Sequence, residues 1–270
     1  MERIRLAAAL LFMLAGGAVH GASALRLPVP TQFGRIAAFS YDTNGRRDGE
    51  ARLSMNRTAA GDVLLQVDIH LDTGARTHLR AWMQPVDHGQ GLRLLTERSW
   101  SRNAHGVPIA AMTIDHRTGV ATCTGVGQGA RSMKLPTPDR VLNVPLNLFL
   151  QPLVAGKVKQ ERFQTLACGK NIRLIDTEAR VTGRIPAARG CEGFVRVHCV
   201  FKLGPFLSVL AGPFLPNVVF WFDAGGDDAW VAHQAPLYAN GPSVLLVRRS
   251  VHPADLDADL RRAEGGPDTE

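Results

Sequence analysis

The sequence lacks the short motifs that mark common enzyme active sites. It contains no G-x-S-x-G nucleophile elbow, no H-E-x-x-H metal motif, no phosphate-binding P-loop and no S-x-x-K pair. The glycines at 125–129 lack the spacing of a dinucleotide-binding fingerprint and indicate a flexible connection. The sequence therefore favours a protein that is not an enzyme, with no catalytic residue and no cofactor. A site assembled from dispersed Asp and His residues would leave no such motif, so a hydrolase or isomerase of that kind stays an alternative.

Cysteine is scarce, with only four residues in the chain. There is no C-x-x-C and no pair of Cys/His doublets, which disfavours a zinc site and a thioredoxin-type dithiol. Four cysteines allow three pairings. Cys191 and Cys199 are close enough to lie across a short hairpin, so we expect them to pair, which leaves Cys123 to pair with Cys168.

Charge is absent from one long stretch, residues 203–222. The stretch is long enough to cross a bilayer, but three prolines interrupt it: Pro205, Pro213 and Pro216. Each proline removes a backbone donor whose loss is costly in a bilayer. We therefore expect no transmembrane span in the mature chain, but a helical or looped cover over 204–216 and a buried strand over 218–222.

The N-terminus has the pattern of a secretory signal peptide. Arg3 and Arg5 precede an apolar run over 6–15, and Ala22-Ser23-Ala24 fits a small-x-small cleavage site. The apolar run is short for a membrane anchor, which is the alternative. We expect cleavage after Ala24 and a periplasmic or secreted protein.

Positive charge predominates in the body of the chain. The whole chain has a formal net charge of +7, although the tail from 253 to 270 carries six acidic residues against Arg261 and Arg262. A basic body outside the cytoplasm indicates an anionic envelope surface, lipid head groups or acidic partners rather than nucleic acid. A plain solvated basic surface is the other interpretation.

Short segments rich in Val, Leu, Ile, Thr and Trp follow one another and predict strands. Those before the middle of the chain cover 50–58, 63–71, 77–85, 92–102, 107–115 and 120–124. Later ones cover 157–167, 171–183, 194–201, 231–238 and 243–251. Turn residues at hairpin spacing separate them, which predicts an antiparallel meander.

Between these two groups, apolar residues recur at helical spacing from Leu142 to Leu153. A helix beginning near 136–139 is expected to cover one face of the sheet. Because Pro145 would break it, a start at 144–146 with Asn143 as cap is the alternative. The predicted fold class is mainly β (α+β): a curved antiparallel sheet or half-barrel with one or two covering helical segments. A signal peptide over 1–24, a single domain over 25–252 and an acidic tail over 253–270 complete the chain.

Several polar residues invite a functional interpretation, which their spacing does not support. His70 and His78 lie on neighbouring predicted strands and could approach each other, but metal binding is not expected. The carboxylates around Gly225 and Gly226 do not fit a calcium loop, and Asp115-His116 has the position of a turn.

The organisation resembles the periplasmic lipoprotein-carrier (Lol) half-barrels, and more closely an exported bacterial family of unknown function thought to share that architecture. Three features over 33–252 carry the resemblance: the meander, the L-x-x-x-L-x-x-F-L segment at 142–150, and the late strand pair from 220–223 to 247–249. It implies that acyl chains lie against a concave sheet under helices. This chain differs in its four cysteines and in the prolines of its apolar stretch.

The leading hypothesis is thus a non-enzymatic periplasmic protein that binds a lipid or a lipidated partner in an apolar groove. The predicted groove residues are Leu146, Phe149, Leu150, Phe206, Leu207, Leu210 and Phe214. The alternative to this hypothesis is a structural or partner-binding envelope protein with a filled core.

Overall fold

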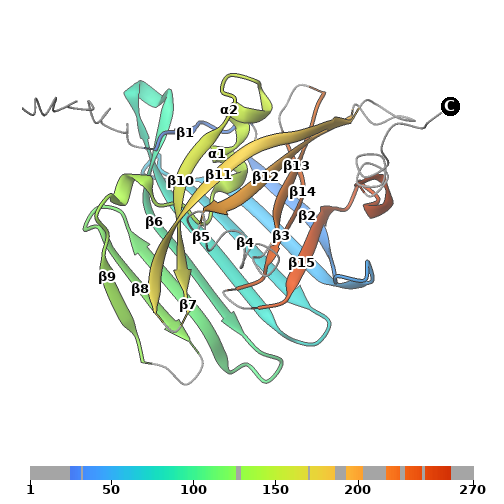
Figure 1. Ribbon diagram of the computed structural model, residues 1–270, viewed down its shortest axis with the longest axis horizontal. Coiled ribbons are helices and arrows are strands. Elements are labelled where there is room, and N and C mark those ends of the chain that lie inside the picture. The colour runs from blue at the N-terminus through green and yellow to red at the C-terminus, as the bar shows by residue number, and fades with distance from the viewer. Residues whose placement is uncertain are drawn as a thin grey trace, which may run out of the picture.

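One antiparallel sheet makes up most of the protein (Figure 1). The computed structural model describes residues 25–31, 33–125, 129–169, 171–185, 193–202, 217–225, 229–238 and 241–256. The predicted signal peptide, Cys191, residues 203–216 and most of the acidic tail lie outside the described residues.

The described strands all pair antiparallel, in the spatial order β10-β11-β12-β13-β14-β15-β2-β3-β4-β5-β6-β7-β8-β9, with β1 on β6. Their bounds are β1 Leu27–Pro28, β2 Gly34–Tyr41, β3 Arg47–Arg57, β4 Val63–Leu71, β5 Arg76–Val86, β6 Gly91–Arg102, β7 Pro108–Asp115, β8 Val120–Gly125, β9 Arg131–Lys134, β10 Glu161–Cys168, β11 Ile172–Ile185, β12 Phe194–Lys202, β13 Val218–Asp223, β14 Trp230–Pro236 and β15 Ser243–Arg248. The predicted mainly-β class with a large antiparallel sheet is confirmed. Most predicted strands match to within a few residues at each end, and β4 matches in full.

Three of the described strands are not among those predicted: the two-residue β1, and the longer β2 and β9. β2 presents the small residues Ala38 and Ser40 to the interior, so its hydrophobic alternation is weak. β9 has four residues with a single apolar side chain, Met133, so period-2 patterning is absent. β2 pairs with β3, and β9 pairs with β8. In each case the neighbouring strand offers backbone N–H and C=O groups that would otherwise lack a partner.

The sheet curls until its two ends meet. In the strand order, β10 is at one end of the sheet and β8 is the second strand from the other end. The Cys123–Cys168 disulfide nevertheless joins β8 to β10, with a Cα–Cα distance of 5.6 Å. Residues 141–143 pair with the edge of β10, where Leu142 donates its N–H to the Gln164 carbonyl at 2.8 Å. A separate apolar cluster fills this seam, made of Met112, Ile114, Ala121, Cys123, Leu135, Val141 and Leu166.

The predicted covering helix is broken into short pieces. A 3-10 turn spans Pro138–Arg140, and two single-turn helices follow, α1 at Leu146–Phe149 and α2 at Gln151–Val154. The alternative start near Leu146 was the correct one, because Pro145 cannot continue a helix from earlier residues. Asn143 does not cap it: its side-chain amide donates to the Leu166 carbonyl and its side-chain oxygen accepts the Leu166 N–H, both at 2.9 Å. Asn143 thus extends the pairing of the edge strand.

The interior of the curled sheet is filled around α1 and α2. Leu148, Phe149, Leu150 and Leu153 are all at most 3% exposed and join the inward side chains of the strands in the main core. The Phe149 ring packs edge-on against Phe163, with centroids 5.2 Å apart. Each such side chain contributes about 1.5–3 kcal/mol by leaving water, so the broken helix is held by packing rather than by helix propensity. Among the described residues no helix is long and apolar enough to span a membrane.

Candidate functional site

The structure describes three of the seven predicted groove residues. Phe149 and Leu150 are 3% and 0% exposed and point into the main core, while Leu146 is half-buried beside it. Phe206, Leu207, Leu210 and Phe214 lie outside the described residues. The three described members thus lie on the inner side of the covering segment, two of them within the filled core, and their role in a groove stays a prediction.

The structure has a hollow of about 120 Å³ between Asn147 of α1 and strands β2, β3 and β4. We call it the Phe33 hollow. Its lining is Phe33, Gly34, Arg35, Ile36, Leu53, Ser54, Met55, Leu65 and Asn147. Phe33 stands at its rim with 39% of its surface exposed, and the Arg57 guanidinium lies 4.9 Å from the centre of its ring.

The volume of the Phe33 hollow limits what it can hold. Drug-sized ligands occupy pockets of roughly 300–1,000 Å³. An apolar cavity of about 150 Å³ is enough for a benzene molecule. The hollow, at about 120 Å³, therefore accommodates one apolar side chain or the end of an acyl chain, and not a whole lipid.

A second cluster is polar and lies at the seam. The carboxylate of Glu97, on β6, and the imidazole of His116, after β7, are 0% and 4% exposed and lie 2.9 Å apart. The other oxygen of Glu97 accepts the backbone N–H of Asn143, at 2.8 Å, and that of Val144. The Nδ1 atom of His116 lies 3.0 Å from the carbonyl of Pro138. The pair thus ties the segment before α1 to the sheet.

These partners fix the protonation of the imidazole. A carbonyl oxygen can only accept, so Nδ1 carries a proton toward Pro138. The Nε2 atom of His116 lies 2.9 Å from a side-chain oxygen of Glu97, to which a protonated imidazole donates. Burial lowers the pKa of His116, but the hydrogen bond and the negative charge of Glu97 outweigh it and raise that pKa overall. The raised pKa favours the imidazolium form of His116, which pairs with the Glu97 side chain.

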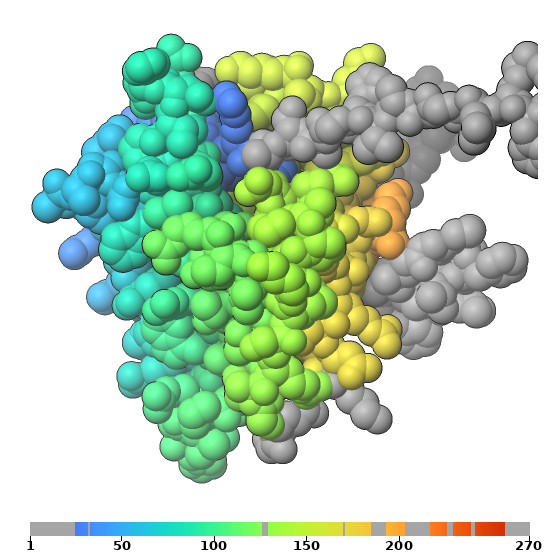
Figure 2. All heavy atoms as spheres, turned by 90° about the vertical axis from the view of Figure 1, so that its left-hand side faces the viewer, coloured from blue at the N-terminus to red at the C-terminus, as the bar shows by residue number. Residues whose placement is uncertain are grey.

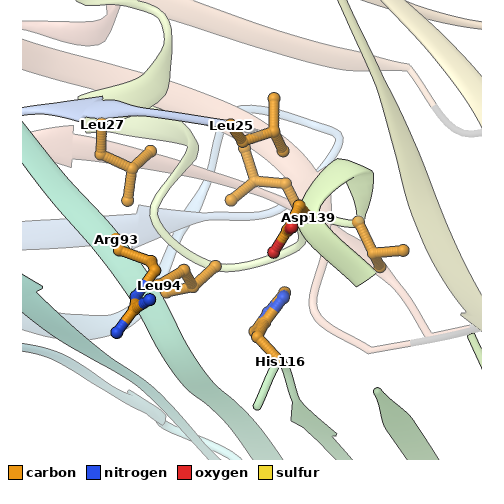
Figure 3. A pocket seen from close by; sticks show the side chains of 8 residues that line it. Leu25, Leu27, Arg93, Leu94, His116 and Asp139 are labelled. Carbon is orange, nitrogen blue, oxygen red and sulfur yellow. The ribbon is translucent and has the colours of Figure 1, made fainter. Parts of the chain in front are cut away.

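A narrow crevice opens beside this pair (Figure 3). His116 and Asp139 approach it from opposite sides, and Leu25, Leu27, Arg93 and Leu94 complete most of the lining. Its volume is about 10 Å³, which is near the room that one water molecule needs. Since both imidazole nitrogens are engaged, His116 has no free atom for proton transfer to a substrate. The pair holds structure together.

The sequence signal for this pair is present but indirect. Asp115 does behave as a turn residue, accepting the N–H of Arg117 at 2.9 Å. The partner of His116 is Glu97, 19 residues earlier. Glu97 stands in the inward phase of β6, opposite Ala81 of β5, which is 0% exposed. A buried carboxylate is stable only with a hydrogen-bonding or charged partner. An acidic residue at an inward-facing position of a predicted strand therefore indicates that such a partner exists.

Among the described residues, the other candidate polar side chains form no metal-binding cluster. His70 and His78 do approach, with ring centroids 6.2 Å apart, and His78 bonds the carboxylate of Asp68. Over the described ranges no three His, Cys, Asp or Glu side chains are close enough to share a metal ion. Asp223 accepts the N–H of Gly225 at 3.0 Å, as in an ordinary turn, and Asp227 and Asp228 lie outside the described residues.

The cysteines follow the sequence prediction in one pair. Cys123 and Cys168 are joined as expected. Cys199, for which a bond to Cys191 was expected, has a free thiol that is buried within β12 opposite Ala179 and Val218. Cys191 itself lies outside the described residues. Burial raises the pKa of the Cys199 thiol to about 12, which keeps it protonated and unreactive.

Comparison with known proteins gives no family for the chain. No protein-family profile matches it, and no curated protein matches it in sequence. Among solved structures, it is similar to a β-barrel-like protein of a domain of unknown function, DUF1849, from Brucella abortus. The two share 8% sequence identity over 82% of this chain and 97% of that one, with a TM-score of 0.45.

Proposed function

We propose that this protein is an exported, non-enzymatic binding protein of the cell envelope, and that the Phe33 hollow receives one apolar side chain of a partner protein. The observation that carries the proposal is the size of the hollow, about 120 Å³, in an apolar wall beside a filled core. The signal-peptide pattern of residues 1–24 supports export.

A second candidate is a lipid or a lipidated partner. The uncharged stretch at 203–222 favours it, as does the position of the hollow against α1, in which Leu146 is one of the predicted groove residues. In that case the hollow would hold only the end of an acyl chain. The Glu97–His116 pair does not support a hydrolase, because hydrogen bonds occupy both imidazole nitrogens.

Photo-crosslinking in cells tests both candidates. A photoreactive amino acid replaces Ser54, which lines the hollow, and Met55→Trp then fills the hollow in the same protein. We expect an adduct with one defined protein, lost when Met55→Trp is added. A control probe at Thr122, on β8 and away from the hollow, should give no such adduct.

The mass of the adduct decides between the candidates. A lipid adduct that disappears with Met55→Trp would support the second candidate and refute the first. An adduct pattern equal to that of the Thr122 control, or one that persists after Met55→Trp, would refute both.

A further inference from the structure

Arginines gather on the outer side of β5 and β6. These two strands contain Arg76, Arg80, Arg93, Arg98 and Arg102, and their single acidic residue, Glu97, points inward. Arg52 of β3 lies on the same outer surface, opposite Asp68 of β4. We call the exposed set Arg52, Arg76, Arg80, Arg98 and Arg102 the arginine face. The outer surface of β6 and the strands after it faces the viewer in Figure 2.

The strand register places like charges directly opposite each other. Arg80 of β5 faces Arg98 of β6, and Arg76 faces Arg102. Side chains in such positions have Cβ atoms roughly 5 Å apart, and like charges there destabilise a sheet. Among the described residues none of the five guanidinium groups of the arginine face forms an ion pair. The face therefore presents positive charge that the fold does not neutralise.

Aromatic side chains lie between the arginines. His78 stacks on Trp100 with ring centroids 5.0 Å apart, and the Arg80 guanidinium lies 5.1 Å from the centre of the same indole. The carboxylate of Asp68 is engaged by His78. Trp82 is 40% exposed, and its indole N–H donates to Asp62 at 2.9 Å. The surface thus combines guanidinium groups with indole rings held in place by stacking and hydrogen bonds.

We propose that the arginine face docks on the surface of an anionic lipid bilayer. Guanidinium groups bind phosphate oxygens in bidentate geometry, and tryptophan favours the head-group region. The two opposed arginine pairs are four residues apart along their strands, which is about 14 Å at ~3.4 Å per residue. One small phosphate cannot reach both pairs, whereas a head-group layer offers many. The N-terminus predicts export, and an exported protein is separated from the nucleic acid of the cytoplasm.

Vesicle sedimentation tests the proposal with the purified mature chain. The probe is a vesicle of phosphatidylglycerol and phosphatidylcholine, compared with phosphatidylcholine alone. We expect binding to the anionic vesicles, weakened by salt as the Debye length falls from about 10 Å at 0.1 M toward 3 Å at 1 M. Arg80→Gln with Arg98→Gln should lower the partition coefficient roughly 25-fold, at about fivefold for each arginine near an anionic bilayer.

The matched control is Lys159→Gln with Arg173→Gln, which removes the same charge from exposed positions outside the arginine face. It should bind like the unmodified protein. The Arg80/Arg98 variant should also unfold at the same temperature as the unmodified protein or a higher one, because the change relieves repulsion within the sheet. Equal binding to both vesicle types, an equal loss in the control, or tighter binding to a DNA duplex than to anionic vesicles would overturn the proposal.

Discussion

Replacing Glu97 by glutamine should show how much the buried pair stabilises the seam. The substitution keeps the shape of the side chain but removes the charge that faces His116 and the N–H groups of Asn143 and Val144. Removing one member of a buried ion pair costs about 3–5 kcal/mol, because the other member is left buried without compensation. The Glu97 and His116 side chains are 0% and 4% exposed, so we expect a loss of about 3–5 kcal/mol in the free energy of unfolding, measured by urea denaturation.

The pH dependence gives this prediction a second readout. The pKa of His116 is raised in the folded protein, so the stabilisation from its charge is fully present below the unfolded value of about 6.5 and is lost as the pH rises through the folded pKa. The unfolding free energy of the unmodified protein should therefore fall on the alkaline side of this range. Without the Glu97 charge that raises the pKa, Glu97→Gln should show no such fall.

A double-mutant cycle completes the measurement. Glu97→Gln combined with His116→Leu removes both charges, so it should cost less than the two single changes added together. Additive costs, a loss below about 1 kcal/mol for Glu97→Gln, or identical pH profiles for the unmodified protein and Glu97→Gln would refute the assignment of an imidazolium–carboxylate pair.

Three further predictions concern the core and the disulfide. Cys123→Ser with Cys168→Ser opens a loop of 45 residues, which should lower the free energy of unfolding, measured by urea denaturation, by roughly 4 kcal/mol. Adding reductant to the unmodified protein should cause an equal loss, which would confirm the disulfide as the cause. Leu150→Ala, at 0% exposure, should cost about 2–5 kcal/mol in the same assay, whereas Leu146→Ala, half-buried, should cost less. Burial lowers the pKa of His233 to about 4. Below pH 6.5 the unfolded chain therefore takes up a proton that the folded chain does not. The free energy of unfolding should fall by up to about 3 kcal/mol as the pH is lowered to 4. His233→Phe, which can keep the stacking on Phe220, should abolish that acid-side fall, and an unchanged acid limb would contradict it.

The strands and the covering segment show how far local patterns reach. The nine residues of β4 match their predicted range because alternation of apolar and polar residues over one strand is a purely local signal. In the covering segment, helical spacing correctly selected Leu142, Leu150 and Leu153 as buried. It did not predict the break into α1 and α2, since proline geometry interrupts a helix that the apolar pattern alone would continue.

The candidate sites depend more on contacts between distant parts of the chain. Leu146, Phe149 and Leu150 come from one short segment, so spacing could place them together. The Phe33 hollow needs β2, which patterning missed, together with β3, β4 and α1. Only the packing of these four elements decides whether a hollow remains between them and how large it is.

The sequence by itself determined the mainly-β class, the position of most strands and the side of each strand that is apolar, because these properties repeat with a period of two residues along the chain. The tertiary structure alone decided the register between neighbouring strands and how the two ends of the sheet meet. That arrangement joins Cys123 to Cys168, brings Glu97 to His116 and sets Arg80 against Arg98. Each of these contacts depends on strand register and on the closure of the sheet, and neither leaves a periodic trace in the residues concerned.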